Sequence, residues 1–460
     1  MLSNLAARDV ETVIHPYTNL AALRDAGPLV IERGKGVWLY DSEGKSYIDS
    51  MAGLWCTALG YGNAELVEAA AAQMRKLSFG HLFASKSHDA AIELAEKLKE
   101  IVPALASKIF FCASGSEAND SQVKFVRYMN NALGRPKKKK FISRQKGYHG
   151  VTLASASLSG LPPNHLDFDL PLPGFLHTGC PHHYRYAQPG ESEEEFATRL
   201  AAELAHLIER EGPETVAAFI AEPVMGAGGA IVPPKTYFEK ISAVCAKYDV
   251  YTISDEVICG FGRLGTPFGC QALNFKPHSI SIAKALSSAY LPIAAVTVPE
   301  QMYAAMLDES RKIGTFGHGF TYGGHPVSAA VALKTLEIYA RERIFEKAAA
   351  KAPRFQARLR KLGEHPLVGE ARGFGLVGGI ELVADKASKR AFDPKRGVAA
   401  RAVHFAQAEG VISRFLAGDT LSLCPPLVIA DEEMDEMFAR LARALDRTYA
   451  WARQERLISA

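Results

Sequence analysis

The chain has 460 residues, of which 48% are hydrophobic and 22% are charged, and its formal net charge is +3. These values are ordinary for a globular enzyme, and the length exceeds what one simple core supports, so we expect two domains. A net charge this small gives no reason to expect nucleic acid as a partner.

The seven cysteines include no C-x-x-C pair, which argues against a disulfide framework or a zinc site. Cys180, His182 and His183 look like a metal cluster, but adjacent histidines in a proline-containing loop are typically surface groups, so we predict no metal. The N-terminal segment lacks the apolar core of a signal peptide, and no stretch reaches the ~20 apolar residues of a membrane span. We therefore expect a cytoplasmic protein that makes no membrane contact.

The first predicted elements are a hairpin and a helix. Residues 36–40 and 45–49 are β-rich and flank Asp41–Gly44, whose composition suits a turn. Before them, Pro16 favours an extended chain at His15. After them, residues 63–76 are predicted to form the first long helix.

From about residue 60 to residue 325, short apolar strands alternate with helices. The strands are predicted at 109–113, 141–145, 216–221, 250–254, 279–283 and 294–298, and the helices at 116–131 and 237–248 and from 191. Such alternation predicts a mostly parallel α/β sheet covered by helices.

After residue 326 the composition changes. Helices are predicted at about 327–340, 344–362, 396–409 and from 431, with strands near 368–383 and on both sides of Arg414. We therefore expect a large domain over residues 60–325. Residues 1–59 and 326–460 are expected to form a smaller α+β domain.

Two charged residues lie at the ends of predicted strands. Asp255 follows strand 250–254, and Lys284 follows strand 279–283. Ligands of open parallel sheets bind at the carboxyl ends of strands, so these side chains are expected to meet. They suit pyridoxal phosphate, because a lysine forms the Schiff base and an acid pairs with the pyridine nitrogen. On spacing alone, a salt bridge at the sheet edge is the alternative.

The sequence around this pair resembles the class III (omega) aminotransferases. It reads D-E-V-I-C-G-F-G-R from Asp255, then A-K ending at Lys284, then S-S-A-Y-L-P-I. The resemblance extends from about His15 to the C-terminal region. It implies a fold-type-I pyridoxal-phosphate enzyme with a seven-stranded-type sheet and with Lys284 and Asp255 as catalytic residues. Ala285 and Leu264 depart from the family's usual Gly and Thr, but neither change removes a chemical group.

The resemblance also assigns residues to the cofactor. In S-G-S-E-A-N, Gly115 and Ser116 would bind the phosphate at a helix N-terminus, and an ordinary helix cap is the alternative. In G-Y-H-G, Tyr148 would stack on one face of the pyridine ring, and Val257 would pack on the other face. Glu222 matches an acid near the site, and a surface acid is the alternative.

Thr321 matches the family residue that reaches the phosphate bound in a neighbouring subunit. This match implies a homodimer with active sites at the interface, alone or within a tetramer. A Gly-rich loop with a buried aromatic residue is the alternative.

Other residues match the substrate pocket of the amine:pyruvate branch, namely Tyr17, Trp55, Phe83, Tyr148 and Ala227. Any one of these aromatic residues alone would more often belong to a core. Arg414 matches the mobile arginine that binds the carboxylate of the keto acid acceptor. A guanidinium suits that role because it binds a carboxylate bidentately and stays charged.

These assignments predict an amine:pyruvate transaminase that moves an amino group from a primary amine or ω-amino acid to a keto acid by ping-pong chemistry. Within the family, the alternatives are an aminomutase, a racemase or a transaminase that uses 2-oxoglutarate. Outside enzymes, the alternative is a catalytically silent scaffold of the same fold. A requirement for a keto acid distinguishes a transaminase from an aminomutase or a racemase. A yellow colour that is discharged by amine excludes the scaffold.

Overall fold

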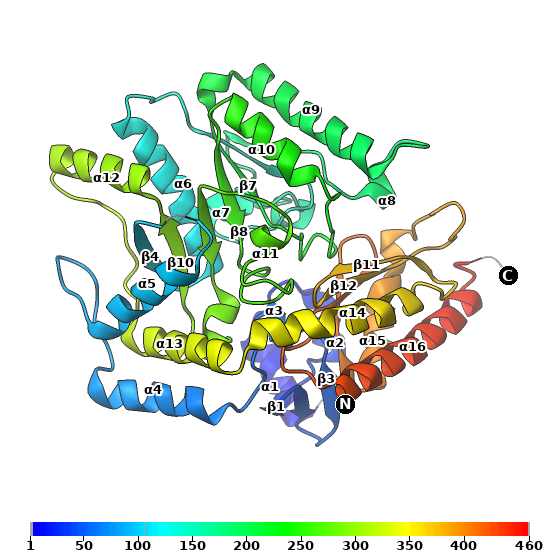
Figure 1. Cartoon of the computed structure of the whole chain (residues 1–460). Coiled ribbons are helices and arrows are strands. Elements are labelled where there is room, and N and C mark those ends of the chain that lie inside the picture. The colour runs from blue at the N-terminus through cyan, green and yellow to red at the C-terminus, as the bar shows by residue number, and fades with distance from the viewer. Residues whose placement is uncertain (1–2, 105, 459–460) are drawn as a thin grey trace.

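The computed structural model describes residues 3–104 and 106–458, and its centre is a seven-stranded sheet (Figure 1). The strand order is β4 (Lys108–Cys112), β10 (Ala294–Val298), β9 (Ser279–Ile282), β8 (Tyr251–Asp255), β7 (Val216–Ala221), β5 (Lys140–Arg144) and β6 (Phe175–Thr178). Neighbouring strands are parallel except β10, which is antiparallel to both β4 and β9. The predicted mostly parallel α/β sheet is confirmed.

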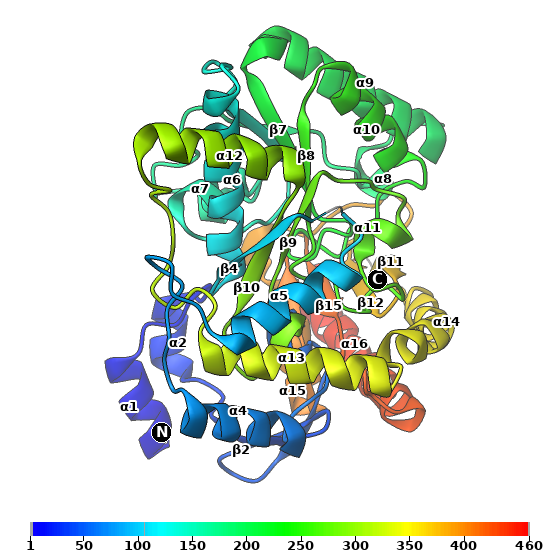
Figure 2. The same ribbon diagram turned by 60° about the vertical axis from the view of Figure 1, so that its left-hand side comes forward.

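Helices cover both faces of this sheet. Phe219 of β7 packs in one buried cluster with α5, α9, α10 and α13, whereas Ala218 and Ile220 pack in another with α6 and α12. One strand supplies both clusters because successive side chains point to opposite faces. Figure 2 shows α6, α7 and α12 together on one side. The bounds are α4 (Ala64–Lys76), α5 (Asp89–Ile101), α6 (Gly115–Ala132), α7 (Leu153–Leu158), α9 (Glu193–Glu211), α10 (Tyr237–Lys247), α12 (Glu300–Ile313) and α13 (Pro326–Arg341).

Two four-stranded sheets lie outside this region. One has the order β1 (Ile31–Lys35), β2 (Trp38–Asp41), β3 (Ser46–Asp49) and β13 (Val411–Ile412). The other has the order β11 (Val368–Phe374), β12 (Val377–Leu382), β15 (Thr420–Leu423) and β14 (Arg414–Leu416). The parallel β3–β13 pair joins the N-terminal segment to the C-terminal part of the chain. The domain boundaries near residues 59 and 325 stay predictions.

The remaining elements are short or flank these sheets. They are α1 (Asn4–Thr12), α2 (Leu20–Ala26), α3 (Ala52–Trp55), α8 (His183–Tyr186), α11 (Gly269–Ala272), α14 (Ile344–Leu362), α15 (Val398–Ala408), α16 (Asp431–Gln454) and the 3-10 turns η1 (Pro162–Asn164), η2 (Pro213–Thr215), η3 (Lys284–Ser287) and η4 (Pro394–Arg396). Within the described ranges, no helix is long and apolar enough to cross a membrane.

Local sequence signals explain where several elements begin. The Asn63 side chain accepts hydrogen bonds from the backbone of Glu65 and Leu66 and thereby caps α4. Ser192 and Glu195 form a capping box at the acidic start of α9, in agreement with the predicted helix. The predicted hairpin is confirmed as the antiparallel pair β2–β3.

Other elements differ from the predictions. Arg414 is the first residue of β14 and does not lie between two strands. β6, α5 and α12 are additions to the predicted elements. β6 has the sequence FLHT, in which only two residues are apolar, so its strand character depends on pairing with β5.

Candidate active site

The structure brings Asp255 and Lys284 to the same edge of the central sheet. Asp255 is the last residue of β8 and pairs in register with Ser281 of the parallel strand β9. Lys284 begins the 3-10 turn that follows β9. No ion pair joins the two side chains among the residues that the structure describes. The salt-bridge alternative is therefore wrong, and the carboxylate has other partners.

Three N–H groups hold the buried Asp255 carboxylate. Asn119 Nδ2 and His149 Nδ1 lie 2.7 Å and 2.8 Å from Oδ2, and the Val257 N–H donates to Oδ1 across 3.1 Å. Asn119 also donates to the His149 backbone oxygen across 2.7 Å, which ties α6 to the loop after β5. Donors around a carboxylate fix its orientation. The Asp255 carboxylate is thus held in one orientation, with acceptor capacity left on Oδ1.

The Lys284 side chain is half-buried and lies beside the Trp55 ring. Burial lowers the pKa of its amine below the usual range, although the negative charges of Asp255 and Glu222 oppose that effect. Nζ lies 5.5 Å from the centre of the Trp55 ring. A lysine with a lowered pKa presents more neutral amine, the form that attacks carbonyl carbon.

The backbone at this site is strained. Tyr17, Trp55 and Lys284 have positive φ angles of 50°, 60° and 51°. Such angles cost about 1–3 kcal/mol each in side-chain-bearing residues, and they gather at functional sites when the surrounding structure enforces them. No pattern in the sequence indicates this strain, because none of these positions is a glycine.

The N-terminus of α6 opens toward Asp255. A Cβ at Gly115 would lie 3.0 Å from the Val257 side chain, so a larger residue there would press on Val257. A Cβ at Gly150, where φ is +133°, would lie 2.5 Å from Ser116 Oγ. The first N–H groups of a helix have no intrahelical acceptor, so Gly115 and Ser116 present free donors. This arrangement suits a phosphate.

Aromatic rings and one guanidinium lie close together beside Lys284. The rings of Tyr17 and Tyr148 are 6.4 Å apart and nearly perpendicular. Arg414 Cζ lies 5.5 Å from the centre of the Tyr17 ring and 5.3 Å from that of the Trp55 ring. Burial lowers the pKa of Arg414. This group thus combines aromatic rings with a partly desolvated cation.

Glu222 is buried. Its two carboxylate oxygens accept hydrogen bonds from the backbone N–H groups of Tyr148, across 3.0 Å, and Gly226, across 2.9 Å. Burial raises the pKa of Glu222. The surface-acid alternative is wrong, and the carboxylate instead links the Tyr148 loop to the loop that carries Ala227.

Phe83 and Thr321 lie apart from this group. A Cβ at Gly319 would come within 2.9 Å of the Phe83 ring, so these two predicted site residues belong to neighbouring segments. Both side chains are exposed, as is that of Tyr17. The structure therefore places Phe83 and Thr321 together on neighbouring exposed segments.

Sequence reasoning did not assign roles to Asn119 and His149. Both stand inside the quoted phrases S-G-S-E-A-N and G-Y-H-G, so the signal was present. Neither motif shows that both side chains converge on Asp255, which is 136 and 106 residues away in sequence.

The residues present fit pyridoxal phosphate. Lys284 supplies an amine, Asp255 supplies a fixed carboxylate, and α6 supplies an N-terminus. Within the described ranges, the buried Trp55 Nε1 and His149 Nε2 atoms have no hydrogen-bond partner, as expected where a polar ligand or water belongs.

Comparisons with known proteins agree with this geometry. A sequence model of the family described as "Aminotransferase class-III" matches residues 21–445. A gamma aminobutyrate transaminase 3, chloroplastic, from Solanum lycopersicum is 51% identical over 97% of this chain and 87% of its own length. A probable gamma-aminobutyrate transaminase 3, mitochondrial, from Oryza sativa subsp. indica is 52% identical over 95% of this chain and 86% of its own length.

A solved structure is also similar over the whole chain. The omega transaminase from Pseudomonas jessenii in complex with PMP has a TM-score of 0.95 and 53% sequence identity, and the match covers 98% of this chain and 99% of that chain.

Proposed function

The chain belongs to the class III aminotransferases, and from this premise we propose that it transfers an amino group from a primary amine or an ω-amino acid to a keto acid such as pyruvate. The supporting observation is that Arg414 and Lys284 lie 5.3 Å and 5.5 Å from the same Trp55 ring. One pocket therefore offers apolar walls to an uncharged amine and a guanidinium to a carboxylate.

Class III aminotransferases use pyridoxal phosphate. When bound, this group draws electrons away from the substrate carbon that loses its proton. In the proposal, the N–H groups of Gly115 and Ser116 hold the phosphate, and Asp255 pairs with the ring nitrogen. Tyr148 and Val257 enclose the two faces of the ring and exclude water from it.

Lys284 has two tasks in this proposal. Its neutral amine would hold the cofactor, and the same Nζ would move the proton at the substrate carbon. Burial supports both tasks because it lowers the pKa of this amine. The keto acid then takes up nitrogen by the same steps in reverse, which makes the reaction ping-pong.

Replacing Arg414 with alanine should separate the two half-reactions. Charge-assisted hydrogen bonds to a carboxylate contribute roughly 1.5–3 kcal/mol, so the pyruvate half-reaction should slow by about 10- to 150-fold. The half-reaction with an uncharged arylalkyl amine should be nearly unchanged, because its substituent needs no cation. Stopped-flow absorbance records both. Equal losses would mean that Arg414 supports the fold or the cofactor.

A panel of donors and acceptors tests the substrate class. The proposal expects alanine to form from pyruvate with primary amines, and little product from 2-oxoglutarate. Preference for 2-oxoglutarate over pyruvate would favour the alternative of a 2-oxoglutarate-dependent transaminase. Turnover without any keto acid would favour an aminomutase or a racemase. The panel includes 4-aminobutyrate, the compound in the names of the plant relatives.

We further propose a homodimer in which Thr321 reaches the phosphate bound in the partner's site. Phe83 and Thr321 are exposed in one protomer and lie apart from the group around Lys284. A second copy would bring them to the site.

Mixed dimers test this shared site. Lys284→Ala and Thr321→Asp subunits should each be inactive alone, the latter because the new carboxylate repels the phosphate. In a mixed dimer, one of the two sites would combine an intact Lys284 with an intact Thr321, so activity should return on mixing. Activity that stays absent in mixed dimers verified by mass spectrometry would place Thr321 in its own subunit's site.

We also propose a cytoplasmic location for the protein. Cell fractionation with an antibody against the chain tests it.

A further inference from the structure

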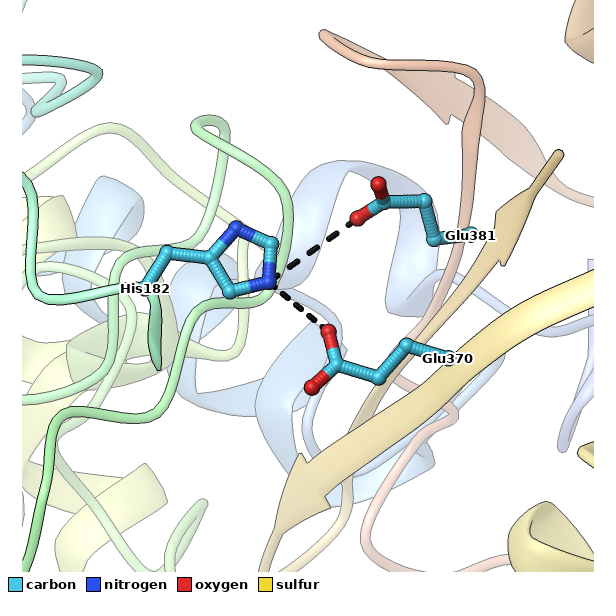
Figure 3. A group of neighbouring side chains, drawn as sticks. All are labelled: His182, Glu370 and Glu381. Atoms are coloured by element: carbon cyan, nitrogen blue, oxygen red, sulfur yellow. Dashed lines mark hydrogen bonds and ion pairs between the residues drawn. The ribbon is translucent and has the colours of Figure 1, made fainter. Parts of the chain in front are cut away.

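A cluster that resembles a metal site lies between the central sheet region and the smaller domain (Figure 3). His182 Nε2 is 2.7 Å from Glu370 Oε2 and 3.9 Å from Glu381 Oε2. Contrary to the prediction, His182 is buried, with 2% of its surface exposed. The same two oxygens accept from Arg372 Nη1, and Arg185 pairs with Glu381. The carboxylates are thus already neutralised by guanidinium groups, and a cation would have to displace Arg372.

Arg372 is the centre of this cluster. Besides the two acids, its Nε donates to the Gly229 backbone oxygen across 2.8 Å, and its Nη2 lies 3.1 Å from Thr420 Oγ1. All three nitrogens therefore have acceptors, and the side chain is only 8% exposed. A planar guanidinium with an acceptor at each nitrogen holds its partners in one geometry.

Gly229 belongs to residues 226–230, which we call the pocket loop because they include Ala227. A Cβ at Gly228 would lie 2.2 Å from the Lys146 backbone oxygen, and a Cβ at Gly229 would lie 3.0 Å from Arg372 Nη2. The pocket loop is thus wedged between the chain leading to Tyr148 and the Arg372 side chain. Its first N–H is held by Glu222. One end of the pocket loop is therefore held by Glu222 of the large domain, and the other end is held by Arg372 of the smaller domain.

Arg372 shares a sheet with Arg414. The order β11-β12-β15-β14 places Arg372 on one edge strand and Arg414 on the other, and we call it the Arg414 sheet. Thr420, the Arg372 partner, pairs in register with Leu416 of β14. A Cβ at Gly229 would lie 3.6 Å from the Ala417 backbone oxygen in the β14–β15 turn. The contacts of Arg372 therefore span the sheet toward the strand that carries Arg414.

We propose that Arg372 is a positioning residue that docks the Arg414 sheet onto the pocket loop and so sets where the Arg414 guanidinium stands relative to Ala227. This inference rests on the proposed function, in which Arg414 binds the carboxylate of the acceptor. Arg372 does not touch the substrate; it acts through Arg414.

Arg372→Lys tests the inference because it keeps the charge between Glu370 and Glu381 but cannot serve all four acceptors at once. Displacements near 1 Å cost up to about 100-fold, so the keto acid half-reaction should slow by about 10- to 100-fold. The half-reaction with an uncharged arylalkyl amine should change by less than about 2-fold, within ordinary context effects. Stopped-flow absorbance measures both.

Two further measurements distinguish positioning from general support of the fold. In an Arg414→Ala background, Arg372→Lys should cause almost no additional loss, because the residue through which it acts is gone. Amide hydrogen exchange in residues 226–230 should also become faster in Arg372→Lys. This second readout needs no activity, so it still tests the docking contact if the wild-type protein fails to use any keto acid.

Matched variants complete the test. Arg358→Lys changes an exposed arginine of α14 that pairs with Asp435 and should leave both readouts unchanged. Thr420→Val keeps every charge and should give a smaller loss in the same half-reaction, which covers the case in which Arg372→Lys fails to fold. The inference would be overturned if Arg372→Lys slowed both half-reactions equally. It would also be overturned if Arg372→Lys caused its full loss in the Arg414→Ala background, or if amide hydrogen exchange in residues 226–230 stayed unchanged.

Discussion

Lys284→Ala should lower turnover by roughly 10⁴-fold or more. Proton transfer by a positioned side chain contributes about 10²- to 10⁴-fold, and loss of the covalent attachment adds to that deficit. The variant should still bind pyridoxal phosphate, because the N-terminus of α6, Asp255 and the Tyr148 ring are unchanged. Its visible spectrum should lack the band of the lysine-bound cofactor.

Borohydride reduction followed by peptide mass spectrometry gives an independent readout. In the wild-type protein, the peptide containing Lys284 should gain the mass of the reduced cofactor, and in Lys284→Ala no peptide should. Lys276→Ala is the matched control, because Lys276 is an exposed lysine that lies just before β9, the strand that Lys284 follows. Near-normal turnover of Lys284→Ala would refute the assignment.

Asp255→Asn should slow proton removal in both half-reactions while cofactor affinity weakens much less. Two unit charges 4 Å apart interact by about 4 kcal/mol at an effective dielectric of 20, equivalent to about 10³-fold in rate. The Asn119 and His149 donors at Oδ2 favour an amide oxygen at that position. The amide nitrogen would then face the ring nitrogen and the Val257 N–H, so it cannot keep the ring protonated.

Stopped-flow absorbance gives the two half-reaction rates, and equilibrium dialysis gives the affinity for the cofactor. Asp308→Asn on the exposed surface of α12 is the control. Wild-type rates in both half-reactions of Asp255→Asn would place the electron-withdrawing role elsewhere.

These variants also address the scaffold alternative. A scaffold needs neither a lysine with a lowered pKa nor three donors around a buried carboxylate. Strain at Tyr17, Trp55 and Lys284 also costs stability without serving a passive fold. The chain is an aminotransferase by family, and the geometry agrees.

The amino-acid sequence by itself determined the central sheet and the pair at its edge. Strand–helix alternation and turn residues are local signals, and parallel strands necessarily bring their carboxyl ends together. Asp255 and Lys284 can therefore be placed at the same edge of the sheet from their positions at strand ends and their residue types. The glycines Gly115 and Gly150 of the S-G-S-E-A-N and G-Y-H-G phrases lie where a side chain would meet Val257 or Ser116.

Only the tertiary structure decided which other side chains surround that pair. Asn119 and His149 reach Asp255 because α6 and the loop after β5 pack against the end of β8, and no local pattern encodes that packing. His182 has the local sequence of a surface histidine, yet it is buried because β11 supplies Glu370 from 188 residues away. Arg372 carries no signal in the sequence, since the value of a buried guanidinium depends on acceptors that distant segments bring to it.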